Sequence, residues 1–157
     1  DTSFVFGGEN IIDGKGDIIQ SICPEKDFDL KEAINDKYEV AAHAAFYKRE
    51  VIEKVGLIDT TTRTSEMDYW IRVGRVFPIH RVSKILSNFR VHEDSFSGSK
   101  EAAKATRDAF IISRRYGGSI FSPRALRYYR FVVLDSLRLY PLIHKLYPVV
   151  RKVLRRR

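Results

Sequence analysis

The sequence has 157 residues, of which 44% are hydrophobic and 31% charged, a composition that fits one globular domain or part of one and excludes a disordered chain. Its single cysteine, Cys23, excludes an internal disulfide and favours a reducing compartment. The net charge of +8 is uneven: residues 1–102 carry 14 Lys and Arg against 18 Asp and Glu, whereas residues 103–157 carry 14 against 2, which predicts an anionic partner for the second part.

The first forty residues predict two strand-forming stretches and a short helix. They open without a charged region followed by an apolar run, so no signal peptide is visible, and we expect the chain to begin inside a larger protein. Residues 4–6 are apolar and predict a buried strand that ends at the Gly-Gly pair after it. Residues 11–19 read as a hairpin whose Asp-Gly pair supplies a turn with positive φ. The capping-box spacing of Asp29 and Glu32 predicts a helix over residues 30–35.

The middle of the chain predicts further strands and helices. Residues 40–47 are a strand-like run of small side chains, which lets a backbone or a ligand come close. Residues 48–55 predict a helix that the following glycine closes. Residues 76–79 and 84–89 each read as a strand. Residues 100–115 predict a helix stopped by a second Gly-Gly pair, so the fold class is α/β with strands early and helices late.

Two acids, Glu66 and Asp68, lie one residue apart in the stretch TSEMDYWIRV. In a structural interpretation, Ser65 caps a helix, Asp68 bonds back to that cap, and Arg72 stands at the favourable i,i+4 spacing from Asp68. In a functional interpretation, Glu66 points outward on the face that it shares with Trp70, while Arg72 holds Asp68. A free carboxylate near a dry pocket is a candidate general base.

A longer series of motifs surrounds these acids: AAFYKREVIEKVGLID, a polar loop, SEMDYWIRV, ILSNFRVH and S-x-S. Their order and spacing over residues 1–116 resemble the C-terminal half of the family 2 glycosyltransferases of bacterial surface-polysaccharide synthesis. The resemblance implies the C-terminal part of a GT-A (Rossmann-like) α/β domain over 1–116, and the pattern of the remaining residues, 117–157, predicts basic amphipathic helices. It implies an inverting enzyme of hexosyltransferase type that moves a sugar from a nucleotide-sugar to a hydroxyl of a glycan or lipid-linked acceptor.

The resemblance also implies roles for single residues. The first acid, here Glu66, would take the proton of the acceptor hydroxyl, and the second, Asp68, would support the acceptor or the helix. The family more often has Asp in the first position, so either acid remains a candidate for the base. His92 would complete the ligands of a divalent metal, Mg or Mn, with a loop hydrogen bond as its structural alternative. Arg90 would meet a phosphate, with a solvated surface arginine as the alternative.

Two further residues are candidates for the acceptor side. His43, in the small-residue run, would line the acceptor site, and its alternative is a core histidine with its hydrogen bonds satisfied. Trp70 would form an acceptor wall, and its alternative is a core aromatic. The family's nucleotide-binding half, with its metal-binding D-x-D, would precede Asp1. The D-x-D of this chain, residues 27–29, stands before a capped helix, and we interpret Asp29 as the cap. We therefore expect an incomplete enzyme with an exposed apolar surface where the other half packs.

The C-terminal residues 123–157 carry ten Lys and Arg against Asp135 alone. We expect two helices, over 123–139 and 141–156, without an uncharged apolar run near the ~18 residues that span a bilayer. Such basic amphipathic helices are typical of the interface of an anionic membrane, which places the protein in the cytoplasm at the inner face of the cell membrane. The alternative is a helix pair packed on the body of the protein with its arginines in water.

Two other function classes remain alternatives to a glycosyltransferase. A nucleic-acid-binding module is favoured only by the basic tail, and neither zinc spacing nor an RNA-binding aromatic signature accompanies it, so we expect no nucleic-acid partner. A non-catalytic membrane-docking domain would use the same tail without chemistry.

Overall fold

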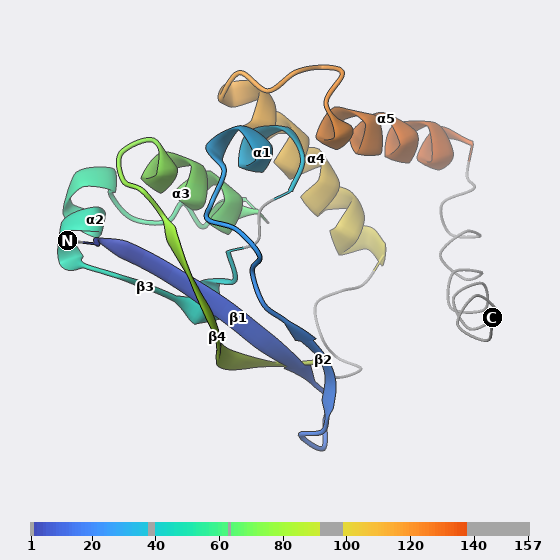
Figure 1. Cartoon of the computed structure of the whole chain (residues 1–157). Helices are drawn as coiled ribbons and strands as arrows, with labels where there is room; N and C mark the ends of the chain where they lie inside the picture. The colour runs from blue at the N-terminus through green and yellow to red at the C-terminus, as the bar shows by residue number, and fades with distance from the viewer. Residues whose placement is uncertain (1, 38–39, 63, 92–98, 138–157) are drawn as a thin grey trace.

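A computed structural model describes residues 2–37, 40–62, 64–91 and 99–137 of the chain. Four strands and five α-helices, with one 3-10 turn, make up the described part (Figure 1). In chain order the elements are β1 (Phe4–Ile12), β2 (Ile18–Ile22), α1 (Leu30–Asn35), η1 (Ala42–Ala44), β3 (Ala45–Tyr47), α2 (Arg49–Val55), α3 (Ser65–Gly74), β4 (His80–Arg90), α4 (Ser99–Arg115) and α5 (Pro123–Ser136). The mixed α/β class predicted from the sequence is confirmed.

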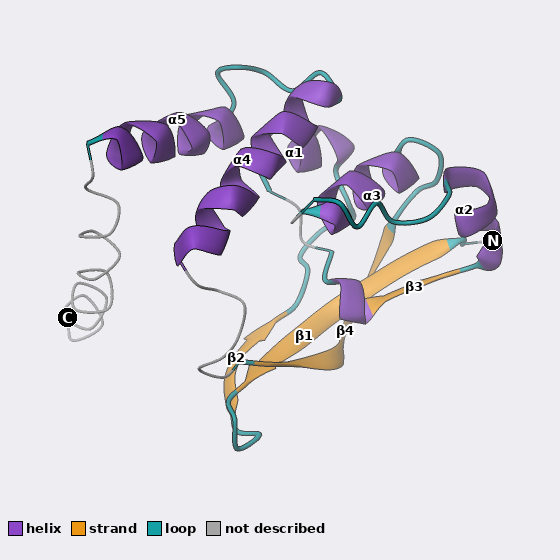
Figure 2. Ribbon diagram, turned by 180° about the vertical axis from the view of Figure 1, so that it is seen from behind, coloured by secondary structure: helices purple, strands orange, loops and turns teal. Residues whose placement is uncertain are grey.

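The sheet is mixed, and β1 is its central strand. One edge of β1 pairs in parallel with β4, and the other edge pairs in antiparallel fashion with β3 over its first residues and with β2 over its last. A parallel pair needs a crossover connection, and here β3, α2 and α3 lie between the two strands in sequence. Figures 1 and 2 show the longer helices gathered on one side of this sheet.

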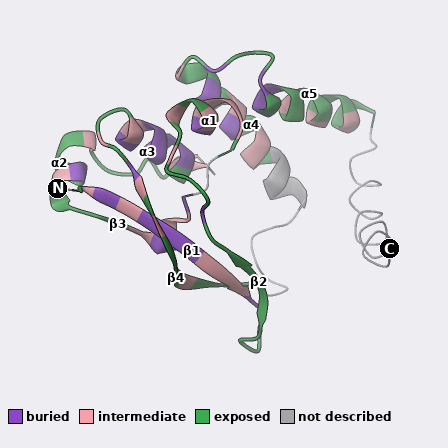
Figure 3. Ribbon diagram, in the orientation of Figure 1, coloured by how far each residue is buried: buried purple, intermediate pink, exposed green. Residues whose placement is uncertain are grey.

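Helix α3 is the element that joins the sheet to the other helices. Tyr69, Trp70 and Val73 pack with Phe4 and Phe6 of β1 in one apolar cluster. On the other side of the helix, Met67 and Ile71 pack in a second cluster with Ala33 of α1 and with Ala109 and Ile112 of α4. Both sides of α3 are therefore buried, as its colouring in Figure 3 shows. This burial fixes the position of the two acids in its first turn.

The predicted first strand is too short, because β1 continues through the Gly-Gly pair to Ile12. A side chain at Gly8 would meet the carbonyl oxygen of Ile22 and lie 2.9 Å from the Cα of Cys23, so glycine here allows β2 to approach β1 closely. The predicted hairpin is confirmed. Asp13 accepts hydrogen bonds from three successive backbone N–H groups of the turn, but the positive φ falls at Gly16 and not in the Asp-Gly pair.

Other predicted boundaries hold in part. The helix over residues 30–35 is confirmed with Asp29 as its cap, and the helix before Gly56 begins one residue later than predicted. The predicted strand over 76–79 is wrong, whereas the strand over 84–89 is confirmed as part of a longer one. Residues 80–90 form one strand, while the N–H groups of Val76 and Phe77 bond the last turn of α3 instead. The small-residue run is a 3-10 turn followed by the three-residue strand β3, not one strand.

The expected exposed apolar surface is present on the strands. Ile18 and Ile19 of β2 are 62% and 58% exposed, and Phe46 of β3 is 57% exposed. None of the helices within the described residues has the length and apolar character that a membrane span requires. The predicted second tail helix lies outside the described residues, and the first ends at Ser136, a few residues before the predicted end.

Candidate functional site

An open pocket of about 680 Å³ lies where β1, β2, η1, β4 and the start of α3 meet. Its described lining residues are Glu9, Ile22, Cys23, Glu25, Val40, Ala41, Ala42, His43, Glu66 and Phe89. Three of these side chains are carboxylates, and none of these described residues is a lysine or an arginine. The pocket is therefore acidic, with an apolar and aromatic part of its wall beside the carboxylates.

Glu66 contributes a carboxylate to this pocket from the first turn of α3. The side chain is exposed, and the described residues give it neither an ion pair nor a hydrogen bond. The helix dipole stabilises a negative charge at this position. Glu66 is thus a carboxylate that can accept a proton from a molecule in the pocket.

Asp68, two residues later, has the opposite environment. It is 5% exposed, and its carboxylate accepts hydrogen bonds from the Tyr116 hydroxyl at 2.8 Å and from Arg72 Nε at 2.9 Å. Arg72 in turn donates to the carbonyl oxygens of Val55 and Leu57. Asp68 therefore ties α3 to the ends of α2 and α4, and it does not line the pocket.

The start of α3 differs from the predicted cap. Thr64 is the N-cap, without a side-chain hydrogen bond, and Ser65 is the first helical residue. Asp68 consequently lies one position too late to bond back to the cap. The predicted pairing of Asp68 with Arg72 is confirmed, while Tyr116 was not foreseen as a partner. Burial, and after it the hydrogen bond to Asp68, raises the pKa of the Tyr116 hydroxyl.

His43 lies in the pocket and not in the core. Its side chain is 39% exposed, its ring is paired with the carboxylate of Glu9, and it stacks on Phe89 with 5.3 Å between ring centroids. The alternative of a satisfied core histidine is therefore wrong. The structure brings His43 and Glu66 together in one pocket.

Trp70 belongs to the core. It is 2% exposed and meets the Phe4 ring edge-on with 5.2 Å between centroids. Its indole Nε1 is buried without a hydrogen-bond partner among the described residues. Trp70 does not line the pocket, so the predicted acceptor wall is not supported and the core alternative describes its position.

The predicted phosphate and metal residues lie apart from these groups or outside the described residues. Arg90 donates to the carbonyl oxygens of Asp13 and Gly14, both at 3.0 Å, and so holds the hairpin turn, while its contact with a phosphate stays a prediction. His92 lies outside the described residues. Asp29 caps α1 as predicted, and Asp27 accepts from the Arg81 N–H at 2.7 Å. That bond is the largest of the effects that lower the pKa of Asp27.

No group of three or more His, Cys, Asp or Glu side chains within the described residues is arranged to hold a metal ion. The divalent metal and His92 as its ligand therefore stay predictions. No protein-family model matches this chain, and no curated protein matches it. The likeness to family 2 glycosyltransferases thus rests on the order of the sequence motifs.

Proposed function

We propose that this chain is the acceptor-side part of an inverting glycosyltransferase, with Glu66 as the general base. One observation carries the proposal. Within one helical turn, Glu66 is exposed in an open pocket, while Asp68 is buried and held by Tyr116 and Arg72. Of the two acids in the motif, Glu66 is therefore the one that a substrate can reach.

The proposed reaction assigns a proton acceptor and a leaving group. The hydroxyl oxygen of the acceptor attacks the anomeric carbon of a nucleotide-sugar, and its proton passes to the carboxylate of Glu66. The bond between that carbon and the nucleoside diphosphate breaks, and the diphosphate leaves with the electron pair. A divalent ion, where bound, would stabilise the negative charge that develops on the leaving diphosphate. Within the described residues we assign no set of metal ligands. All other roles that we propose are those of residues that line the pocket.

The position of Glu66 is fixed by the elements around it. Both sides of α3 are packed against apolar clusters, and the Asp68 contacts hold its first turn from two directions. A base of this kind needs a constant distance to the reacting hydroxyl, because proton transfer depends steeply on geometry.

The pocket lining also favours one class of acceptor. The carboxylates of Glu9, Glu25 and Glu66 can accept hydrogen bonds from sugar hydroxyl groups, and Phe89, which is 46% exposed, offers a ring for a sugar face. The absence of lysine and arginine from the described lining disfavours acceptors with a phosphate or carboxylate near the reacting hydroxyl. The proposal is therefore a neutral sugar hydroxyl as the acceptor.

Two features of the sheet support the proposal that this chain is part of a GT-A domain. The parallel pairing of β1 with β4 across helical connections is the α/β arrangement that the family resemblance implies. The exposed apolar side chains of β2 and β3 are consistent with further segments packing on this sheet.

Nuclear magnetic resonance of this chain tests the pocket with methyl glucoside and methyl glucuronide as matched probes. We expect methyl glucoside to shift the resonances of the His43 and Phe89 rings, and the uronide to bind at least about tenfold more weakly because of the carboxylates. The variant Glu53→Gln, on the exposed face of α2, should bind methyl glucoside like the wild type. Equal binding of both probes, or shifts confined to other residues, would remove the acceptor assignment.

A further inference from the structure

Helix α5 packs on the body of the protein through its arginine side. Arg124 is 8% exposed and donates from Nε to the carbonyl oxygen of Ile34 at 3.1 Å and from Nη2 to that of Ala33 at 2.9 Å. Arg127 donates to the carboxylate of Asp36 at 2.7 Å. These acceptors lie in the last turn of α1 and just after it, where the helix dipole favours a cation. Two of the basic residues expected to face a membrane thus bind the end of α1 instead, Arg124 buried and Arg127 at the surface.

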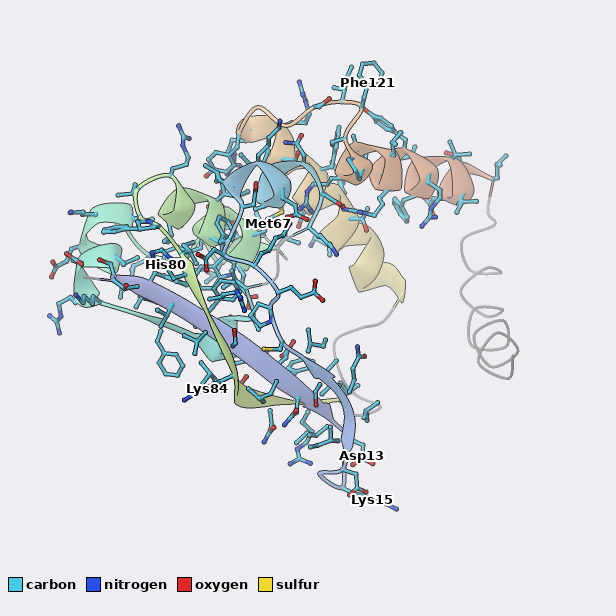
Figure 4. The ribbon with its side chains drawn as sticks, viewed as in Figure 1. Asp13, Lys15, Met67, His80, Lys84 and Phe121 are labelled. Atoms are coloured by element: carbon cyan, nitrogen blue, oxygen red, sulfur yellow. The ribbon has the colours of Figure 1, made fainter. Side chains whose placement is uncertain are left out.

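The opposite side of α5 is an exposed apolar ridge. The ridge consists of side chains spaced three or four residues apart, with exposed fractions of 57%, 39%, 55% and 61%: Leu126, Tyr129, Val133 and Leu137, the last directly after α5. Tyr129 lies at the border of the ridge, because its ring also meets Phe110 of α4 edge-on. Phe121, in the loop before α5, is 80% exposed, and Figure 4 shows it pointing away from the body. Of the predicted alternative, the packing on the body of the protein is confirmed for α5, while Arg124 is buried against α1 and does not lie in water.

We propose that this ridge inserts into the interface of an anionic lipid membrane. An apolar stripe on a surface helix needs a cover that removes it from water, and four large side chains in one row form a continuous stripe. The charge of the tail sequence selects the kind of cover, because residues 123–157 carry ten Lys and Arg and Asp135 is their only acid. Among the described residues of this stretch, Arg124 and Arg127 contact α1 and Arg130 is exposed.

The same charge argues against other covers. A second copy of the chain would bring an equally basic segment against the first, and like charges at close range oppose such a contact. A nucleic acid would satisfy the basic residues but would leave the apolar ridge in water, since its phosphates need cations and not leucines. An anionic lipid surface offers both an apolar layer and negative head groups.

The membrane proposal stands apart from the glycosyltransferase proposal, because α5 takes no part in lining the pocket around Glu66. Either proposal can fail while the other holds. If both hold, the ridge brings the pocket to a surface where acceptors attached to lipids are found.

Vesicle flotation of the 157-residue chain tests the ridge with neutral substitutions. The probes are vesicles of pure phosphatidylglycerol and of pure phosphatidylcholine. We expect the chain to float with phosphatidylglycerol, and Leu126→Gln and Val133→Gln each to weaken this binding by about tenfold, because each removes an apolar side chain from the lipid. The matched control is Leu57→Gln, at a site outside α5 that is 78% exposed, and it should float like the wild type. Unchanged flotation of both ridge variants would overturn the proposal.

A fluorescent label on the ridge reports the polarity of its surroundings directly. In a Cys23→Ser background, an environment-sensitive dye on Val133→Cys should shift to the blue on addition of phosphatidylglycerol vesicles, while the same dye on Leu57→Cys should not. Three outcomes would refute membrane insertion. The first is a dye at position 133 whose emission is already shifted to the blue without lipid. The second is a dimer in sedimentation that becomes a monomer in Leu126→Gln. The third is flotation of the ridge variants that equals that of the wild type and is lost only when salt screens the charges.

Discussion

Replacing Asp68 or Glu66 with its uncharged amide should affect the stability of the protein differently. Asp68→Asn keeps the size of the side chain but removes the charge that both partners face. The amide oxygen can still accept from Arg72, and the NH₂ group can donate to the Tyr116 hydroxyl, which then acts as the acceptor. Because Asp68 is buried, the weaker neutral contacts loosen the ends of α2 and α4. Glu66→Gln changes an exposed side chain without partners among the described residues, so we expect little change in stability.

The magnitude follows from the contacts of Asp68. The bond from Tyr116 to a buried carboxylate contributes about 1.5–3 kcal/mol. The bond from Arg72, whose side chain is 24% exposed, contributes about 1 kcal/mol after solvent screening. Arg115, at 3.5 Å and 54% exposed, adds almost nothing. The neutral amide keeps both contacts at roughly half their strength, so Asp68→Asn should lower the free energy of unfolding by about 1–2 kcal/mol and Tm by roughly 2–8 °C.

Urea unfolding followed by circular dichroism and Trp70 fluorescence measures both variants under the same conditions. Glu66→Gln should lie within about 0.5 kcal/mol of the wild type, as exposed substitutions usually do. The assignment of the two acids would be refuted by an Asp68→Asn variant as stable as the wild type. It would equally be refuted by a Glu66→Gln variant that loses as much stability as Asp68→Asn.

Three further predictions concern the same framework. The pKa of the Tyr116 hydroxyl is raised above 10.0 in the folded protein, so its contribution to stability is full below pH 10 and is lost as the pH rises further. In urea unfolding measured above pH 10, the stability of Tyr116→Phe should therefore fall less steeply with pH than that of the wild type. Gly8→Ala should cost about 1–3 kcal/mol by overpacking, whereas Gly14→Ala, with nothing within 4 Å of its new methyl group, should be nearly neutral; thermal melts compare them. Arg124→Met should cost about 2 kcal/mol in urea unfolding because it leaves two carbonyl oxygens of α1 without their donor, and a cost near zero would contradict the packing of α5 on α1.

The features that sequence reasoning predicted correctly are mostly local. Asp29 caps α1 through the Glu32 N–H three residues on, and Asp68 meets Arg72 four residues on. Contacts of this kind depend on helical spacing alone, which the sequence displays directly. The separation of the two acids into one exposed and one held could therefore be predicted without the fold.

The features that were missed depend on residues far apart in the chain. Tyr116 reaches Asp68 across 48 positions, and Arg124 reaches α1 across about 90. The length of β4 is set by its pairing with β1, which extends the strand predicted over 84–89 to residues 80–90. A helical wheel separated the arginines of α5 from its apolar residues, but it could not show which side would face the protein.

The central claim, that Glu66 is the base for transfer to an acceptor hydroxyl, is tested most directly by sugar transfer in the protein encoded by the complete reading frame. We expect Glu66→Gln to lower kcat by about 100- to 10,000-fold while nucleotide-sugar binding is kept, because Gln preserves size and hydrogen bonding but takes no proton. Glu53→Gln, on the exposed face of α2, should transfer at the wild-type rate. A Glu66→Gln enzyme that turns over within about threefold of the wild type would contradict the account, since a positioned base contributes far more than that.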